Sequence, residues 1–219
     1  MKLIILIAGG RTGSGLFYSL FDRHSQVCQL PAEFYYDDFW KKIKEIKSCD
    51  LIAEKFIEEH SSFFNSKKNT EERHNKLGEK KNQFFKVSSL IFKKELIKRI
   101  KGKKILFMSL LINIHKAYSL AKNENIDNKK FIMLHLHHRH RLKDFAKFNY
   151  DIIYTVRDPL ANISSSFSGN YENNLFNKKY GPKKFVFMID KILNAIYDLQ
   201  KFNKKIFVIK LENLHTQKD

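Results

Sequence analysis

The feature that most constrains the fold is an apolar run at the start of the chain that leads directly into glycines. Residues 3–8 are all apolar, residues 9–14 form a glycine-rich polar segment, and a helical pattern runs from Gly15 to about residue 24. A short apolar run that stops at a turn is typical of a parallel strand covered on both faces. We therefore expect a buried strand, a loop and a helix whose inward face includes Leu16, Leu20 and Phe17.

Strand-like and helix-like patterns then alternate along the chain. This alternation predicts an α/β fold, with a parallel doubly wound sheet flanked by helices and a strand, phosphate loop and helix at the N-terminus. The expected strands are 27–30, 131–136, 151–156 and 206–211, and the expected helices are 37–60, 88–100, 109–122, 142–148, 160–167 and 183–202.

The length and composition suit one folded domain. The chain has 219 residues, of which 43% are hydrophobic, and this is enough for a sizeable core. We expect a single domain over 1–219. Residues 61–86 are rich in Ser, Lys, Asn and Glu and have little periodicity, so they are expected to form a mobile insertion.

The chain is strongly basic, with a formal net charge of +18. Such a charge favours anionic partners. However, the basic residues are spread along the chain, which argues against a nucleic-acid-binding protein, and a run such as 101–104 is more typical of solvated surface. There are two cysteines, Cys28 and Cys49, and neither a CxxC pair nor a targeting segment is evident. We expect a cytoplasmic protein without a membrane span.

The glycine-rich segment after the first strand is a candidate anion site. A turn between a buried strand and a helix directs several backbone N–H groups at one spot, and Arg11, Thr12 and Ser14 add side-chain donors. The segment matches neither GxxxxGK[ST] nor GxGxxG. Taken alone, it is equally consistent with a tight turn that binds no ligand.

A second candidate anion site follows the strand expected at 151–156. Arg157 ends this strand, Asp158 and Pro159 turn the chain into a helix, and Ser165 lies about two helical turns further on. An Arg and a Ser in these positions can hold one phosphate group. The alternative is a structural ion pair between Arg157 and either Asp158 or Asp151.

Together the two segments resemble the sulfotransferases that use 3′-phosphoadenosine 5′-phosphosulfate (PAPS), and the pattern is most similar to tyrosylprotein-type and bacterial members. The first family motif, a strand, a basic and hydroxyl-rich loop and a helix, is matched by Arg11, Thr12, Gly13, Ser14, Gly15 and Leu16. The resemblance implies that this loop binds the 5′-phosphosulfate. The second motif is matched by Arg157-Asp158-Pro159 and Ser165, which implies that Arg157 and Ser165 hold the 3′-phosphate.

Weaker matches and some departures accompany these two motifs. The matching stretches are 20–24 (LFDRH), 31–33 (PAE) and 211–214 (LENL). Gly15 replaces a hydroxyl residue of the family, and Gly10 stands where a proline is common. The chain ends soon after Glu212, so the C-terminal family region is expected to be short or missing.

Two residues are candidates for the catalytic base that takes the acceptor proton. The resemblance to tyrosylprotein-type enzymes favours Glu33. His135 lies 22 residues before Arg157, as the catalytic His does in small-molecule sulfotransferases, but Met133 stands where those enzymes have Lys. The histidines at 135, 137, 138 and 140 also suggest a metal site. We rank this last, because no acidic or cysteine ligands lie nearby.

The expected activity is therefore sulfuryl transfer from PAPS to a hydroxyl or amine acceptor, with Arg11 stabilising the charge that develops and with no metal. The alternatives are a catalytically impaired nucleotide-binding homologue and a basic nucleic-acid-binding protein. The sequence identifies neither the acceptor nor the oligomeric state.

Overall fold

The computed structural model describes residues 1–68, 76–168, 186, 190 and 194–216. Five strands form one parallel sheet in the order β2-β3-β1-β4-β5. Their bounds are Lys2–Ala8 for β1, Val27–Gln29 for β2, Phe131–Leu136 for β3, Tyr150–Val156 for β4 and Ile206–Lys210 for β5. The α/β class and the parallel sheet predicted from the sequence are confirmed.

The helices follow the alternation expected from the sequence, with different bounds. Those before β3 are α1 Ser14–Ser19, α2 Tyr36–Ile43, α3 Cys49–Glu59, α4 Ser61–Phe64, η1 Ser66–Lys68, α5 Ser89–Ile100 and α6 Phe107–Ala121. Those after β3 are η2 Arg139–Phe145, α7 Pro159–Ser168, α10 Ala195–Gln200 and α11 Leu211–Thr216. Most of the helix expected over 183–202 lies outside the described residues, and α10 is its described part.

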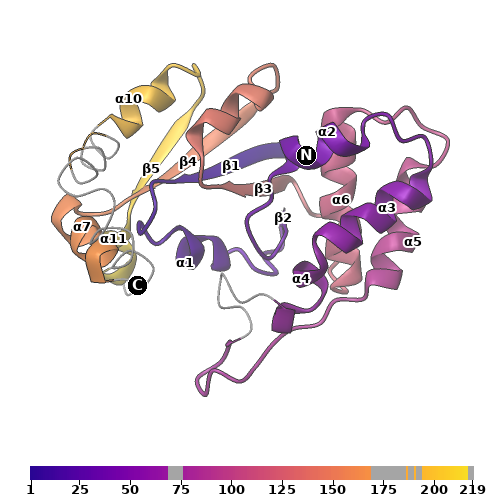
Figure 1. Cartoon of the computed structure of the whole chain (residues 1–219), viewed down its shortest axis with the longest axis horizontal. Coiled ribbons are helices and arrows are strands. Elements are labelled where there is room, and N and C mark those ends of the chain that lie inside the picture. Colours follow the sequence, from indigo (N-terminus) through magenta and orange to yellow (C-terminus); the bar gives the residue numbers. More distant parts are fainter. Residues whose placement is uncertain (69–75, 169–185, 187–189, 191–193, 217–219) are drawn as a thin grey trace. The chain divides into compact units, whose positions relative to one another are not determined.

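The chain divides into two compact units. Unit 1 comprises Met1–Lys2 and Phe21–Leu134, and unit 2 comprises Leu3–Leu20 and His135–Asp219. Unit 1 contains the helices α2 to α6, whereas unit 2 contains β1, β4 and β5 with α1, α7, α10 and α11 (Figure 1). The expectation of one domain over 1–219 stays a prediction.

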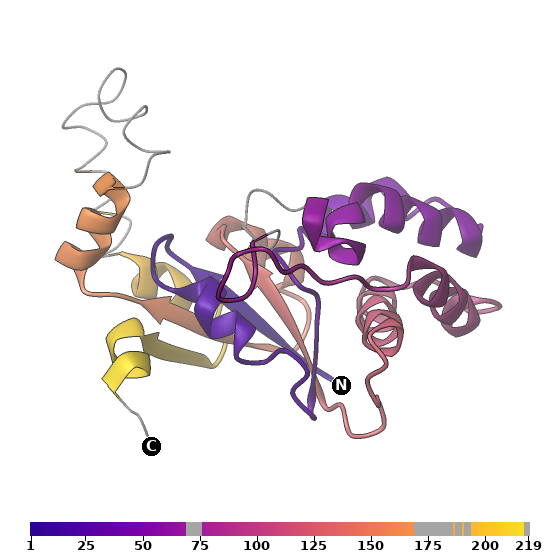
Figure 2. The same ribbon diagram turned by 90° about the horizontal axis from the view of Figure 1, so that it is seen from below.

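Unit 1 is built on a helical layer in which α5 packs against both α3 and α6 (Figure 2). The buried faces of α3 and α5 meet through aromatic rings: Phe56 stacks on Phe92 with centroids 4.9 Å apart. Phe34 meets Phe56 edge to face at 5.5 Å. Each of these three side chains is at most 1% exposed. Aromatic rings of this size contribute a large share of core stabilisation.

The single helix expected over 37–60 is instead two helices. The first helix ends at Ile43. Ser48 begins the second, because its side chain accepts a hydrogen bond from the Leu51 amide at 3.3 Å and caps α3. Serine at such a position satisfies an amide that the helix itself leaves free. Hydrophobic periodicity alone therefore predicted one helix over a range in which a local capping residue starts a second helix.

The insertion expected over 61–86 begins with packed residues. Phe63 and Phe64 are 3% and 6% exposed, and the Ser66 hydroxyl accepts a hydrogen bond from the Phe85 amide at 2.9 Å. Residues 69–75 of this segment lie outside the described part of the chain.

A buried lysine ties three segments of unit 1 together. The side chain of Lys129 is 2% exposed, and its ammonium donates to the carbonyl oxygens of His24 and Val27 at 2.7 and 2.8 Å. It also pairs with the carboxylate of Glu124 at 2.7 Å. Because each of its three protons has an acceptor, the buried charge is fully compensated.

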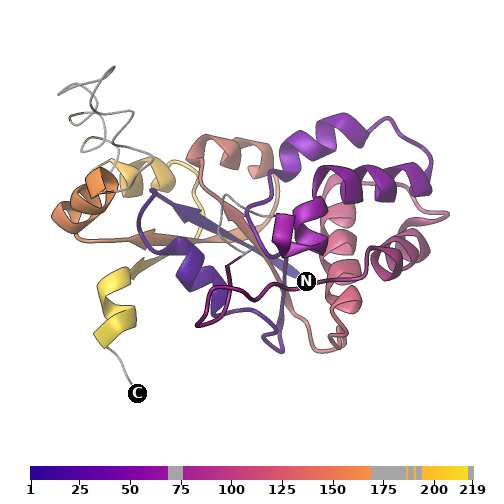
Figure 3. The same ribbon diagram turned by 60° about the horizontal axis from the view of Figure 1, so that its bottom comes forward.

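In unit 2, β1, β4 and β5 lie side by side, and α7 and α11 follow at one end of these strands (Figure 3). The expectation that Leu16 and Leu20 face inward is wrong: these side chains are 47% and 60% exposed. Helix α1 ends at Ser19, and Phe17 and Tyr18 form its buried face. In a helix this short, the buried face is determined by the elements that pack on it and not by a periodic apolar stripe.

No helix within the described ranges is both long and apolar enough to cross a membrane. Cys28 and Cys49 carry free thiols. Burial raises the pKa of the Cys28 thiol.

Candidate functional site

The two motif segments follow neighbouring parallel strands of unit 2. Ala8 at the end of β1 is in register with Thr155 of β4, so the loops after both strands lie at the same edge of the sheet (Figure 3). In the order β2-β3-β1-β4-β5, the chain continues from β1 to one side and from β4 to the other. Ligands of open α/β sheets bind at such a switch point, outside the carboxyl ends of the strands.

The loop after β1 depends on backbone conformations that favour glycine. Gly10 and Gly13 have φ values of 78° and 75°, and Arg11 between them has a φ of 53°. Gly13 also lies so close to Leu211 that a Cβ atom at this position would overlap the leucine side chain. Glycine at 13 is therefore required both by the turn and by the approach of α11.

A hydrogen bond between hydroxyl groups joins this loop to β4. The Oγ1 atoms of Thr12 and Thr155 are 2.9 Å apart, and the two residues are 4% and 1% exposed. Thr12, expected to contact the cofactor, thus has a structural contact inside unit 2. Thr155 was not predicted from the sequence, although a threonine within an otherwise apolar strand is a usable signal.

A second link runs from α7 to the same loop. The side-chain amide of Asn162 donates to the carbonyl oxygen of Gly10 at 3.1 Å, and Asn162 is 3% exposed. Asn162 was not predicted from the sequence. A polar side chain on the inward face of the helix that follows Arg157 could have indicated it.

The segment after β4 is held by a cap and by a carboxylate. Asp158 caps α7, because its Oδ1 accepts from the Ala161 amide at 2.9 Å. Its own amide donates to Oε1 of Glu212 at 3.0 Å. This hydrogen bond lowers the pKa of Glu212. Glu212, a weak match to the family, therefore positions the backbone next to Arg157.

The two arginines of the site are cations without carboxylate partners in the described ranges. Arg11 is exposed and Arg157 is half-buried, and the structure gives Arg157 no ion pair with Asp158 or Asp151 there. Ser165 is half-buried on α7, and Ser14 is 8% exposed at the start of α1. Gly15 and the side chain of Leu16 are exposed. This edge can accept a phosphate-bearing ligand without first losing an ion pair.

His135, one of the two candidate bases, is buried at the end of β3. It is 4% exposed, stacks on Tyr18 with centroids 5.1 Å apart and meets the ring of His137 edge to face at 4.7 Å. Its Nε2 has no hydrogen-bond partner among the described residues. Burial, and to a smaller extent the charge of His137, lowers its pKa to about 3. The imidazole is therefore neutral near pH 7 and is a weak proton acceptor.

Glu33, the other candidate base, follows β2 in unit 1 and is half-buried. Its assignment as the base rests on the resemblance stated above. In the described part of the chain, no group of three or more His, Cys, Asp or Glu residues is arranged to hold a metal ion.

Comparisons with known proteins assign no family to this chain. No protein-family model matches it, and no curated protein is significantly similar to it. The fold class and the site geometry are therefore the grounds on which a function can be argued.

Proposed function

We propose that this protein is a PAPS-dependent sulfotransferase that transfers a sulfuryl group to a hydroxyl or amine acceptor. The observation that carries the proposal is the pairing of two loops at the ends of adjacent parallel strands, each with an arginine that forms no ion pair within the described part of the chain. Thr12 and Thr155 join them on one side, and Asn162 and Gly10 join them on the other. A ligand with two separated phosphate groups matches two such loops.

The 5′-phosphosulfate is assigned to the loop after β1. The first amides of a helix have no acceptor within the helix, and those of α1 follow the turn at Gly13. Arg11 adds a planar donor fork suited to phosphate or sulfate oxygens. Most of the binding free energy at this end is expected to come from these groups.

The 3′-phosphate is assigned to Arg157 and Ser165. This group distinguishes PAPS from ATP, so discrimination between the two ligands depends on this pair. A charge-assisted hydrogen bond to a phosphate contributes about 1.5–3 kcal/mol, which corresponds to roughly tenfold or more in affinity.

In the proposed reaction, the acceptor oxygen or nitrogen attacks sulfur while the bond from sulfur to the 5′-phosphate oxygen breaks. The bisphosphate leaves, and the acceptor proton passes to a base. Arg11 stabilises negative charge on the transferring group and the leaving phosphate. The pKa of about 3 at His135 makes it the weaker candidate base and favours Glu33.

Calorimetry with 3′,5′-adenosine bisphosphate tests the proposal. The wild-type chain is expected to bind the bisphosphate more tightly than ATP, and Arg157→Ala and Ser165→Ala should each reduce that affinity about tenfold or more. Ser164→Ala is the matched control, because this exposed serine lies on the same helix. Equal affinity in all four proteins would remove the assignment of the second loop.

A turnover assay with radiolabelled PAPS and a panel of hydroxyl and amine acceptors tests catalysis separately. Glu33→Gln should abolish transfer while bisphosphate binding persists. Full transfer in this variant would move the role of base to His135. Bisphosphate binding without transfer to any acceptor would favour the catalytically impaired homologue. Binding of nucleic acid without bisphosphate binding would favour the basic nucleic-acid-binding protein.

A further inference from the structure

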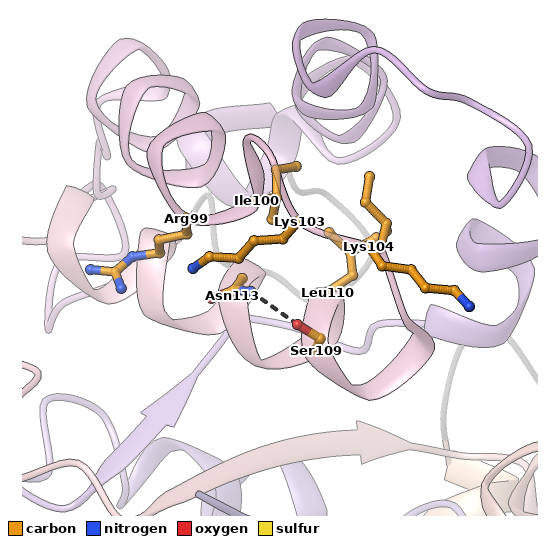
Figure 4. Close-up of a pocket in the computed structure, with 8 residues that line it drawn as sticks. Arg99, Ile100, Lys103, Lys104, Ser109, Leu110 and Asn113 are labelled. Carbon is orange, nitrogen blue, oxygen red and sulfur yellow. Dashed lines mark hydrogen bonds between the residues drawn. The ribbon is translucent and has the colours of Figure 1, made fainter.

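A second cationic site lies in unit 1, in a pocket between the end of α5 and the start of α6 (Figure 4). It is lined by Arg99, Ile100, Lys103, Lys104, Ile105, Ser109, Leu110 and Asn113. Three of these residues are cations, two bear neutral hydrogen-bonding groups, and none is acidic. The pocket belongs entirely to unit 1, so it is separate from the two loops of unit 2.

The local fold explains why the cations gather here. Helix α5 ends at Ile100, which is 3% exposed, and the Lys103 amide closes a turn on the Ile100 carbonyl at 3.1 Å. Gly102 has a φ of 72°, which lets the chain reverse before α6. The buried Ile100 and Leu110 anchor the two helices, so the basic side chains between them project outward.

The charge in this turn is poorly compensated. Residues 98–104 contain five cations and no acidic residue. Within the described ranges the only ion pair they form joins Arg99 to Glu95, at 3.7 Å. The Nε of Arg99 is buried and has no hydrogen-bond partner there. Like charges held close together in one turn repel one another, and an anion bound among them would relieve this cost.

The orientation of the side chains indicates the kind of anion. Arg99 and Lys103 extend in the same direction beside Asn113, whereas Lys104 extends the opposite way (Figure 4). Asn113 donates its amide to the Ser109 hydroxyl at 3.4 Å, which leaves donor capacity on both groups. The first turn of α6 has no acidic residue and no side-chain cap, so it adds no competing negative group.

We propose that this α5–α6 pocket binds a phosphate or sulfate group. Arg99 and Lys103 hold the group, Ser109 and Asn113 orient it, and Lys104 contacts a second anionic group of the same ligand. The ligand class is therefore a molecule with at least two phosphate or sulfate groups. The proposal is independent of the sulfotransferase assignment, because it uses no residue of unit 2.

Inorganic pyrophosphate is the probe that tests the pocket. Calorimetry is done in an Arg11→Ala/Arg157→Ala background, which removes the two arginines of the candidate site in unit 2. One saturable site should remain, and adding Arg99→Gln and Lys103→Gln should weaken it about tenfold or more. Lys80→Gln/Lys81→Gln is the matched control, because it makes the same charge change at exposed lysines elsewhere. No binding in the background, or equal loss in the control, would overturn the proposal.

Trp40 provides a local readout of the same site. It is the single tryptophan of the chain, and its ring meets that of Phe107, the first residue of α6, with centroids 5.5 Å apart. Its fluorescence should change along the same saturation curve as the calorimetric signal. This change should persist in the unit 2 variants, so loss of the pocket and failure of the nucleotide proposal are distinguishable.

Vesicle sedimentation separates a free ligand from a lipid headgroup. Vesicles of phosphatidylcholine with a phosphorylated phosphatidylinositol are compared with phosphatidylcholine alone. Sedimentation that requires Arg99 and Lys103 assigns the phosphate to a lipid, whereas pyrophosphate binding without sedimentation assigns a diffusible ligand. Two results together would contradict the proposed binding pocket. They are sedimentation that is the same in the wild type and in Arg99→Gln/Lys103→Gln, and no binding of pyrophosphate.

Discussion

The side-chain amide of Asn162 donates a hydrogen bond to the carbonyl oxygen of Gly10, with 3.1 Å between nitrogen and oxygen. The two residues are 152 positions apart in the chain, yet this contact fixes the loop after β1 against the helix that follows Arg157. This contact and the hydrogen bond between the hydroxyl groups of Thr12 and Thr155 connect the two candidate anion loops directly. The relative placement of the loops therefore depends on neutral polar contacts and not on the arginines.

The first prediction concerns this contact. Asn162→Ala should weaken bisphosphate binding several-fold and speed amide hydrogen exchange in residues 9–13, because the Gly10 carbonyl loses its buried donor. Ser164→Ala on the same helix should change neither quantity. Exchange that stays at the wild-type rate in Asn162→Ala would show that the hydrogen bond does not hold the loop, whatever ligand the site binds.

A second prediction uses two neighbouring glycines, Gly13 in this loop and Gly15 in α1. Gly13→Ala should lower the free energy of unfolding by about 1–3 kcal/mol, because a Cβ is strained at φ 75° and overlaps Leu211. Gly15→Ala should raise it by about 0.5–1 kcal/mol, because Gly15 lies in α1 with open space around it. Urea unfolding of both variants measures the difference.

The steric part of the Gly13 effect can be isolated with the leucine. Leu211→Ala should recover part of the stability lost in Gly13→Ala, while the conformational cost at φ 75° remains. Strict additivity of the two substitutions would indicate that α11 does not approach the loop as closely as the structure has it.

Lys129 gives a third prediction, on the stability of unit 1. Lys129→Met should cost roughly 3 kcal/mol or more, because two carbonyl oxygens lose their donor and Glu124 loses a buried partner. Lys130→Met at the exposed neighbouring position should be nearly neutral. Chemical denaturation of both variants is the measurement, and similar losses in the two would rule out the network as the cause.

The fourth prediction is a pH dependence that arises from His60. Its ring lies among those of Phe34, Phe39, Phe56 and Phe63, at centroid distances of 4.9 to 5.8 Å. Its Nε2 is buried without a hydrogen-bond partner in the described ranges. Burial lowers its pKa to about 4, while the smaller effects of Glu59 and Lys42 oppose each other.

The unfolded chain takes up the His60 proton near its ordinary pKa of 6.5, well before the folded chain does. Stability is therefore complete above pH 6.5 and falls as the pH drops from 6.5 to about 4, by on the order of 3 kcal/mol at most. His115, whose pKa burial lowers to about 4, adds a loss in the same window. His60→Phe should make this dependence shallower in unfolding curves recorded from pH 7 to pH 4, with the contribution of His115 remaining. An unchanged slope would contradict the buried neutral form of His60.

The elements of the fold could be predicted wherever a local pattern determined them. The apolar run at 3–8 and the segment at 131–136 became β1 and β3, and the Ser88 cap marked the start of α5. Prediction failed where neighbours decided, as at Leu16 and Leu20, because a six-residue helix buries whichever face the sheet covers. It also failed at 37–60, where one helix ends at Ile43 and the Ser48 cap begins another.

For the candidate site, the sequence by itself determined which two segments are candidates for an anion site, because glycines before a helix and an Arg-Asp-Pro turn are local chemical signals. Only the tertiary structure decided that the two segments lie next to each other, and that Thr155, Asn162 and Glu212 hold them there. These contacts join positions that are 54 to 152 residues apart. Their partners are set by the pairing of β1 with β4, which no short stretch of sequence encodes.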